Sequence, residues 1–142
     1  MKTVQHVLQA KSGPVISVSQ DATVYYALAL MARYDIGALV VVDEDGITGM
    51  FSERDYARKV ILHGKSSRDL LVADAMTRQV LTVTPHCTMA DCMAIMTDHR
   101  VRHLPVLDGS GVVGMVSIGD AVKALLDEQR FTIQQLEHYI AS

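Results

Sequence analysis

Two short segments of the chain place a serine and an aspartate three residues apart: Ser52 with Asp55, and Ser117 with Asp120. A carboxylate can accept hydrogen bonds from two adjacent ribose hydroxyls, as the acidic residue of dinucleotide-binding folds does. Where such a pair begins a helix, free backbone N–H groups and the helix dipole also attract phosphate. The same spacing is a capping box, which stabilises a helix end without any ligand. The local pattern alone favours capping.

Other side chains capable of chemistry do not combine into a site. Cys87 and Cys92 have neither CxxC spacing nor a four-ligand zinc pattern, and we expect both to be small buried residues. His99 and His103 are four residues apart, but the helix is predicted to end near Arg100 and His103 to open a strand, so they do not share a helical face. The sequence has no Walker loop, no GxGxxG turn and no nucleophile beside a base. We therefore predict no enzyme activity and no metal.

The composition disfavours several classes of partner. The formal net charge of the 142 residues is −3 and acids and bases are interspersed, so there is no basic stripe for nucleic acid or an anionic membrane. Aromatic residues make up only 5% of the chain, which argues against a base-stacking platform. The longest apolar stretch, residues 36–42, is far shorter than a membrane span, and the N-terminus lacks a secretory signal. We expect a cytoplasmic protein.

The chain repeats itself with a shift of 65 residues. Residues 15–55 align without a gap on residues 80–120, and 13 of the 41 aligned pairs are identical. An internal repeat decides the architecture before any single motif does. The two serine–aspartate pairs therefore occupy equivalent positions in two copies of one structural unit.

Each copy has the pattern of a strand, a helix, a hairpin and a second helix. Alternating residues predict the first strand, apolar residues at spacings of three and four predict the helix, which starts near Asp21 or Pro85, and a glycine turn predicts the hairpin. The methionines on the helical faces are interpreted as core residues. The expected ranges are strands 15–18, 38–42 and 47–51 in the first copy and 80–83, 104–107 and 112–116 in the second, with second helices within 56–75 and over 120–127.

These elements predict an α/β chain of two pseudo-twofold-related β-α-β-β-α repeats, each with a small three-stranded mixed sheet. We assign residues 1–75, which include a short helix over 3–10, to the first repeat, and residues 76–142 to the second. A final segment, 131–140, carries an apolar stripe of Ile133, Leu136 and Ile140. This stripe is expected either to seal a homodimer or to pack back on the same subunit.

The two copies resemble the halves of a cystathionine-β-synthase-type (CBS) domain pair, also called a Bateman module. The family pattern is glycine, two apolar residues, Ser or Thr, two variable residues and Asp, and it is matched at residues 49–55 and 114–120. Residues 101–108 resemble the family's second strand, where proline is common, and residues 75–77 resemble the segment before a second repeat. The resemblance covers nearly the whole chain. It implies a stand-alone, bacterial-type signal-transduction protein, commonly dimeric, whose clefts bind an adenine nucleotide such as AMP, ATP or NAD as a regulatory ligand.

This resemblance reverses the preference for capping, so that a ribose contact is expected at one or both aspartates. It also implies which residues line the clefts. The candidate nucleotide-binding residues are Ser17, Ile36, Gly37, Ala38, Ser52, Arg54 and Asp55 in the first copy, Thr82, Val101, Arg102, His103, Pro105, Ser117 and Asp120 in the second, and Lys11.

Arg54, Arg102 and Lys11 are the candidates for phosphate contacts, although each can equally be a solvated surface charge. Arg54 aligns with Gly119, and Arg102 aligns with Gly37. Because the copies differ at these charged positions, we expect two unequal sites.

Two functions are consistent with these observations. One is a nucleotide sensor that modulates an unknown partner protein, which requires the ligand to prefer one conformation. The alternative is an interaction or dimerisation subunit that works without a nucleotide. A weak nucleotide hydrolase is disfavoured because no catalytic set is present.

Overall fold

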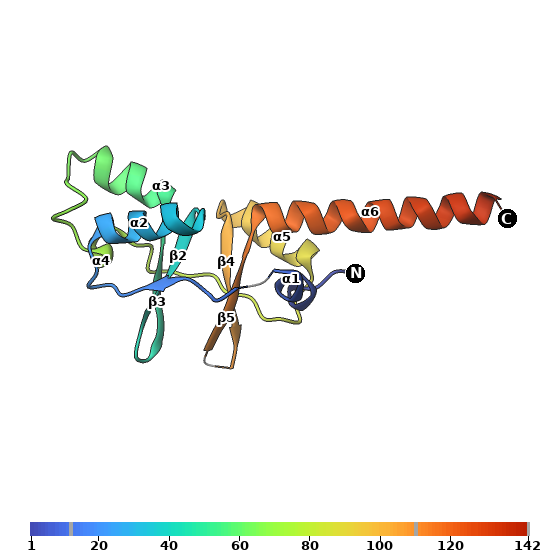
Figure 1. Cartoon of the computed structure of the whole chain (residues 1–142), viewed down its shortest axis with the longest axis horizontal. Helices are drawn as coiled ribbons and strands as arrows, with labels where there is room; N and C mark the ends of the chain where they lie inside the picture. Colours follow the sequence, from blue (N-terminus) through green and yellow to red (C-terminus); the bar gives the residue numbers. More distant parts are fainter. Residues whose placement is uncertain (12, 110, 142) are drawn as a thin grey trace. The chain divides into compact units, whose positions relative to one another are not determined.

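The computed structural model describes residues 1–11, 13–109 and 111–141, and the chain folds as two compact units (Figure 1). One unit comprises residues 15–80, and the other comprises residues 1–14 together with residues 81–142. The order of residues along the chain predicts that the N-terminal helix belongs to the first repeat. In the structure this helix, α1 (Val4–Ala10), packs within the unit of the second repeat, where it contacts β5 (Gly111–Ser117).

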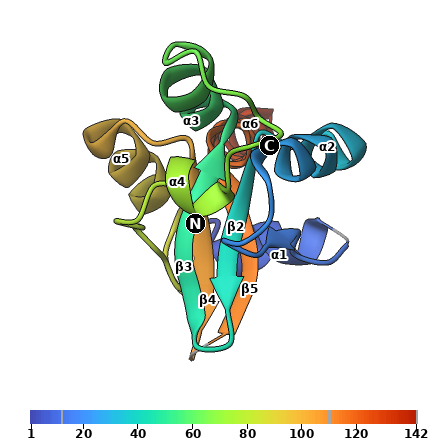
Figure 2. The ribbon, with the colours of Figure 1, turned by 90° about the vertical axis from the view of Figure 1, so that its left-hand side faces the viewer.

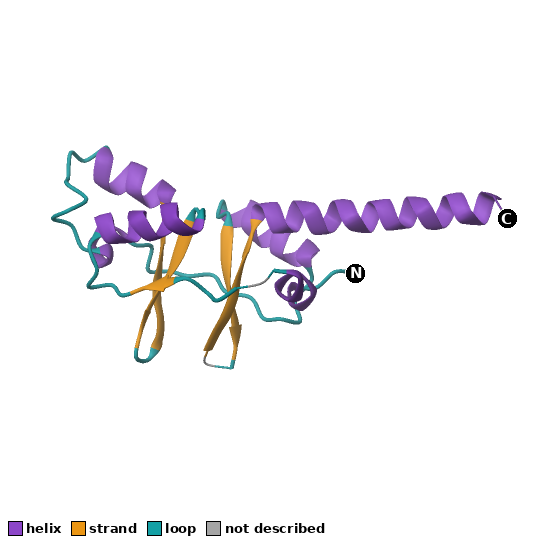
Figure 3. Cartoon of the chain, in the orientation of Figure 1, coloured by secondary structure: helices purple, strands orange, loops and turns teal. Residues whose placement is uncertain are grey.

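The unit of residues 15–80 has the predicted strand–helix–hairpin order. Its sheet contains β1 (Ser17–Val18), β2 (Ala38–Asp43) and β3 (Gly46–Ser52), and α2 (Val24–Tyr34) connects the first two strands (Figure 3). β1 is parallel to β2, and β2 is antiparallel to β3. The predicted three-stranded mixed sheet is therefore confirmed in this unit.

The other unit contains α1, α5 (Met89–His99), β4 (His103–Asp108), β5 and α6 (Ile118–Ala141). β4 and β5 form an antiparallel hairpin, as predicted. The predicted strand over residues 80–83 is reduced to one parallel bridge between Val83 and Val106, made by two backbone hydrogen bonds of 3.1 and 2.9 Å. Figure 2 shows the hairpin of β2 and β3, whose turn lies at the end away from α3.

The helices between first and second strands begin and end at equivalent positions. Thr23 and Thr88 are the N-caps, because their side chains accept hydrogen bonds from backbone N–H groups three residues later. The helices thus start at Val24 and Met89, three and four residues after the entry points predicted at Asp21 and Pro85. Both end at a residue in the left-handed conformation, Asp35 with φ of 52° and Arg100 with φ of 55°.

The second helices differ from the expectation in both units. In the first, α3 (Glu53–Asp55) continues into a π-helical turn, η1 (Tyr56–Ile61), and α4 (Val72–Ala75) follows after a non-helical stretch. In the second, the predicted segments 120–127 and 131–140 form a single helix of 24 residues, α6. No glycine or proline follows Gly119 to stop this helix, and residues 128–130 are Glu-Gln-Arg, all good helix formers.

Each unit has its own core. Phe51, Leu39 and Val41 are fully buried in the first, and Met89, Met96 and Leu104 are fully or almost fully buried in the second, so the helical methionines are core residues as predicted. Among the described helices, none is long and apolar enough to cross a membrane.

The glycine that opens each family-like motif allows a close approach of another segment. A Cβ atom on Gly49 would lie 2.8 Å from the carbonyl oxygen of Thr77, and one on Gly114 would lie 2.5 Å from the Leu8 side chain. These contacts bring the segment after α4 onto β3, and α1 onto β5. The two strands that end at Ser52 and Ser117 are therefore each covered by a neighbouring segment of the same unit.

Candidate functional site

The Ser52–Asp55 pair forms a complete capping box at the junction of β3 and α3. The Asp55 Oδ2 atom accepts hydrogen bonds from the Ser52 N–H at 2.9 Å and from its hydroxyl at 3.0 Å, while the Asp55 N–H lies 3.1 Å from Ser52 Oγ. Asp55 Oδ1 accepts a bond of 2.9 Å from the Thr77 hydroxyl and forms an ion pair of 3.0 Å with Lys59. Asp55 is only 9% exposed. Both of its oxygens are occupied by groups of its own unit.

The Ser117–Asp120 pair repeats the capping geometry at the junction of β5 and α6. The Ser117 N–H donates to Asp120 Oδ2 at 2.9 Å, and the Asp120 N–H donates to Ser117 Oγ at 3.1 Å. Lys11 Nζ lies 2.8 Å from the same Oδ2 atom and 3.0 Å from the carbonyl oxygen of Met115. Within the described residues, no hydrogen-bond donor reaches Asp120 Oδ1. The capping interpretation holds at both junctions, but Asp120 retains an oxygen that can accept further bonds.

The residues predicted to surround the first junction are partly brought together. Ala38 pairs with Ser52 across the β2–β3 ladder, and the Gly37 carbonyl accepts a 3.1 Å bond from the Glu53 N–H. Ala38 is only 2% exposed, so only its backbone can contribute to a surface site. Ser17 pairs with Val40 at the far side of β2 and is exposed, as is the side chain of Arg54.

Several residues predicted around the second junction are connected to it by backbone hydrogen bonds. His103 pairs with Ser117, and the Arg102 carbonyl accepts a 2.9 Å bond from the Ile118 N–H at the start of α6. Pro105 is buried and pairs with Met115, the residue whose carbonyl holds Lys11.

Two further candidates of this unit lie at its edges. Val101 follows α5, where its N–H donates to the Met96 carbonyl at 3.0 Å. Thr82 is exposed beside the single bridge of Val83. Backbone hydrogen bonds and the Lys11 side chain therefore bring the following residues together at the second junction, within one unit: Lys11, Arg102, His103, Ser117 and Asp120.

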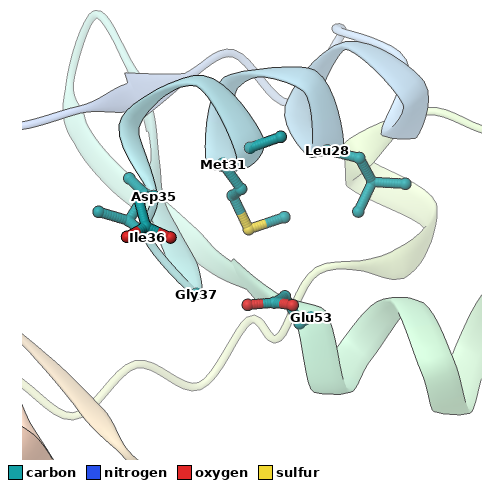
Figure 4. Close-up of a pocket in the computed structure, with 7 residues that line it drawn as sticks. Leu28, Met31, Asp35, Ile36, Gly37 and Glu53 are labelled. Carbon is teal, nitrogen blue, oxygen red and sulfur yellow. The ribbon is translucent and has the colours of Figure 1, made fainter.

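A cavity of about 260 Å³ opens between α2 and the start of α3 (Figure 4). Of the predicted site residues, only Ile36 and Gly37 line it. The carboxylates of Asp35 and Glu53 line it too, and two negative charges disfavour the phosphates of a nucleotide. Neither acid is among the residues predicted from the sequence. The available signal was their position, since Asp35 follows the last residue of α2 and Glu53 follows the serine of the motif.

The two cysteines are free thiols and lie in different surroundings. Cys92 is fully buried, as predicted, and Cys87 is half-buried. Burial raises the pKa of the Cys92 thiol to about 11, with smaller contributions from Cys87 and Asp91. Across the part of the chain that the structure describes, no three histidine, cysteine or acidic side chains gather to hold a metal ion.

Comparison with known proteins agrees with this architecture. The sequence-family model of the CBS domain matches the chain twice, over residues 6–62 and 72–127. A mitochondrial CBS domain-containing protein of Arabidopsis thaliana is 41% identical over 147 residues, which covers 97% of this chain and 71% of the relative.

Two solved structures of CBS-domain proteins are similar in both fold and sequence. One, from Burkholderia ambifaria, has a TM-score of 0.86 and 47% identity and covers 90% of this chain and 96% of that protein. Another, from Agrobacterium tumefaciens, has a TM-score of 0.81 and 37% identity, with 87% of this chain and 98% of that protein covered.

Proposed function

Because the chain belongs to the CBS-domain family, whose members are regulatory modules that often bind nucleotides, we propose that it binds an adenine nucleotide (AMP, ATP or NAD) and thereby modulates a partner protein. The ligand acts as a regulatory signal and undergoes no chemistry on the protein. A change in partner affinity then requires that the ligand interact differently with two conformations of the module.

The observation that carries this proposal is the Ser117–Asp120 junction. Asp120 caps a helix of 24 residues with one oxygen and leaves its other oxygen without a donor from the described residues. Ribose hydroxyls are suitable donors for that oxygen. Lys11 supplies a positive charge 2.8 Å from the carboxylate, and the N-terminus of α6 adds a favourable dipole for phosphate.

The first junction is proposed as the weaker site. Asp55 is engaged by Ser52, Thr77 and Lys59, so a ribose would have to displace one of these contacts. Displacing an existing bond removes most of the gain from the new one. The expected inequality of the two sites thus takes a definite direction, with the Asp120 junction binding more tightly.

Two measurements test the proposal. Mass spectrometry of small molecules released from the purified protein identifies a co-purified nucleotide, and thermal unfolding with AMP, ATP or NAD at millimolar concentration measures binding. A ligand at 100 times its Kd stabilises the folded state by about 2.7 kcal/mol. A raised Tm with adenine nucleotides, lost in Asp120→Ala, is expected, whereas unchanged unfolding with all three would overturn the nucleotide function.

The second half of α6 favours contact with another protein. The predicted stripe residues Ile133, Leu136 and Ile140 are 53%, 57% and 82% exposed, so the expectation that this segment packs back on the same subunit is wrong. Together with Val122 and Leu126 they recur at spacings of three, four and seven on one helical face. We assign this stripe to a contact with a second protein chain.

That assignment also supports the alternative function, an interaction subunit that needs no nucleotide. The two candidate occupants are the regulated protein and a second copy of this chain, since we propose that the module acts as a homodimer. A variant truncated after residue 128 distinguishes these two occupants. If it keeps the dimeric mass in light scattering, the stripe belongs to the regulated protein.

A further inference from the structure

The second half of α6 lies outside the core of its unit. In the described part of the chain, the buried residues of this helix are Ala121 and Ala124, and every residue from 129 to 141 is exposed. Figure 1 shows α6 continuing past α5 and α1, with no described element of the unit beside its C-terminal half. This half therefore adds little to the burial of apolar surface within its own unit.

The repeat itself does not require this extension. In the first unit, the equivalent helical segment ends with η1 at Ile61, and Gly64 follows in the left-handed region with φ of 67°. The shift of 65 residues carries Gly64 onto Gln129, where α6 instead continues to Ala141. Residues 130–141 are thus an addition to the second repeat, and their apolar side chains have no core of the repeat to join.

The exposed stripe of α6 follows a heptad repeat, whose positions are written a to g. The a positions carry Leu126, Ile133 and Ile140, and the d positions carry Val122, Gln129 and Leu136. A β-branched residue at a together with leucine at d favours a parallel coiled coil of two strands. The last three of these positions, Ile133, Leu136 and Ile140, have that composition. The pattern therefore predicts that α6 pairs with one other helix that carries a similar stripe.

We propose that the C-terminal halves of α6 from two copies of the chain form a parallel, two-stranded coiled coil. This inference rests on the homodimer of the proposed function, and it assigns the α6 stripe to the second copy. In a parallel pair in register, each a or d residue faces the same residue of the other helix. Ile133, Leu136 and Ile140 then form successive apolar layers, and a twofold axis along the coil closes the dimer.

Gln129 selects the parallel orientation. It is the one polar residue among the six a and d positions. In a parallel pair it faces Gln129 of the second copy, and the two side-chain amides can donate to and accept from each other. In an antiparallel pair a positions face d positions, so Gln129 would face an apolar residue such as Ile133. Its amide would then be buried without a partner, which is unfavourable.

The charges along the stripe allow two identical helices to approach. Residues 129–141 contain one arginine, Arg130, and one glutamate, Glu137, so their formal charges cancel. In a parallel pair, each g residue lies near the e residue of the following heptad on the other helix. This places Leu125 near Arg130 and Thr132 near Glu137. These e and g positions therefore bring no like charges together.

The first half of α6 prepares the second half for pairing. It packs against α5 and β5, and Ser117 caps its start with a 3.1 Å bond from the Asp120 N–H. An isolated helix of about 12–15 residues is marginal in water, because the first turn is costly to form. Since that turn is already held within the unit, pairing has only to stabilise the continuation of an existing helix.

Disulfide trapping tests which residues face one another across the coil. The background variant Cys87→Ala/Cys92→Ala removes both native thiols and introduces the alanines that the first repeat carries at the equivalent positions. Ile133→Cys and Ile140→Cys are made separately in this background, where both positions are exposed, and the proteins are oxidised with copper phenanthroline. Both should give covalent dimers on non-reducing gels, because each new thiol faces the same thiol of the second copy.

Gln135→Cys in the same background is the matched control. Gln135 is exposed and occupies a c position, on the side of α6 away from the a and d positions, so it should give no covalent dimer. Dimers of Ile133→Cys without dimers of Ile140→Cys indicate antiparallel pairing, in which the two residues 140 lie far apart, and overturn the inference. Absence of covalent dimers in both variants, or equal cross-linking of Gln135→Cys, overturns it too.

A second measurement keeps the native cysteines. Gln129→Leu replaces the polar layer by an apolar one and should lower the Kd of self-association at least about tenfold in sedimentation velocity. His138→Leu adds the same side chain at an exposed f position on the outer side of the helix, and it should leave this Kd unchanged. Equal effects of the two substitutions, or no effect of Gln129→Leu, contradict the coiled coil.

The outcomes separate this inference from the nucleotide function. The Tm shift with AMP is measured on the wild type and on the same variants. A retained shift without cross-linking of Ile133→Cys and Ile140→Cys defeats only the coiled coil. A missing shift in the wild type, together with cross-linked dimers of both variants, defeats the nucleotide function and supports the coiled coil.

Discussion

Lys11 and Asp120 form an ion pair of 2.8 Å although they lie 109 residues apart in the sequence. In the first repeat the equivalent aspartate is paired with Lys59, only four residues away on the same helical segment. The two junctions therefore obtain their positive charge from different parts of the chain. Only the pair at Asp120 links the N-terminal segment to the start of α6, and only that aspartate keeps an oxygen without a donor from the described residues.

Replacement of Lys11 by glutamine should weaken nucleotide binding without destabilising the fold. The Lys11 side chain is 47% exposed, and an exposed ion pair contributes only about 0–1 kcal/mol to stability. Loss of its charge near the phosphate should raise the Kd for AMP by about tenfold. Isothermal titration measures this, with Lys123→Gln, another exposed lysine, as the matched control. Equal affinity in Lys11→Gln and the wild type would remove Lys11 from the site.

Substitution of Asp55 should reduce the unfolding free energy more than substitution of Asp120. Asp55→Ala removes a nearly buried carboxylate with several partners, and we expect a loss of about 2–3 kcal/mol in unfolding free energy. Asp120→Ala loses one cap and an exposed ion pair, for which about 1 kcal/mol is expected. Urea denaturation of both variants gives the comparison. Equal losses would contradict the assignment of Asp55 as the more structural residue.

Gly49→Ala should destabilise the protein more than Gly114→Ala. The new methyl group at Gly49 meets the Thr77 backbone carbonyl, which is held by a 2.9 Å bond from the Met50 N–H. The methyl group at Gly114 meets only the end of the flexible Leu8 side chain. Overpacking typically costs about 1–3 kcal/mol, and we expect Gly49→Ala near the top of that range. The second substitution Leu8→Ala should restore part of the stability of Gly114→Ala and none of that of Gly49→Ala.

Cys92 should resist modification in the folded protein. Its pKa is raised from 9.0 to about 11 by burial, so near pH 8 its thiol is protonated as well as inaccessible. Half-buried Cys87 should react with iodoacetamide first, as mass spectrometry of digested protein would reveal. Because the folded-state pKa is the higher one, the stability linked to Cys92 is complete below about pH 9 and is lost as the pH rises toward 11. Cys92→Ala should flatten the fall of unfolding free energy over that pH range.

Charged substitutions on the α6 stripe should change protein contacts and leave stability intact. Ile133→Glu and Leu136→Glu replace side chains that are more than half exposed, so the unfolding free energy should change by less than about 0.5 kcal/mol. Contact with a second protein chain should be lost, and light scattering of both variants and the wild type measures whether that chain is a second copy. Gln135→Glu, on the exposed part of the same helix, is the matched control. A large drop in stability would indicate that the stripe packs within its own chain.

Much of the architecture follows from local sequence. The hairpins, the helical core faces with Met31 and Met96, and the capping of both Ser-x-x-Asp pairs depend on residues within a few positions of one another, and a helix or a hairpin is formed by such neighbours. For this reason the alternating strand at residues 15–18 was found correctly at its core, Ser17–Val18. Its counterpart at residues 80–83 has the same pattern but makes only one bridge, because strand pairing also depends on a partner that the pattern does not specify.

The amino-acid sequence by itself determined a duplicated CBS-domain fold and the positions of its serine–aspartate junctions. Tertiary structure alone decided that α1 packs with the second repeat and that Asp35 and Glu53 line the same cavity. It also decided that the Thr77 hydroxyl donates to Asp55 and that Lys11 pairs with Asp120. These contacts join residues that are 18 to 109 positions apart, as for Asp35 with Glu53 and Lys11 with Asp120. Their formation depends on how whole elements pack, and no local propensity encodes that.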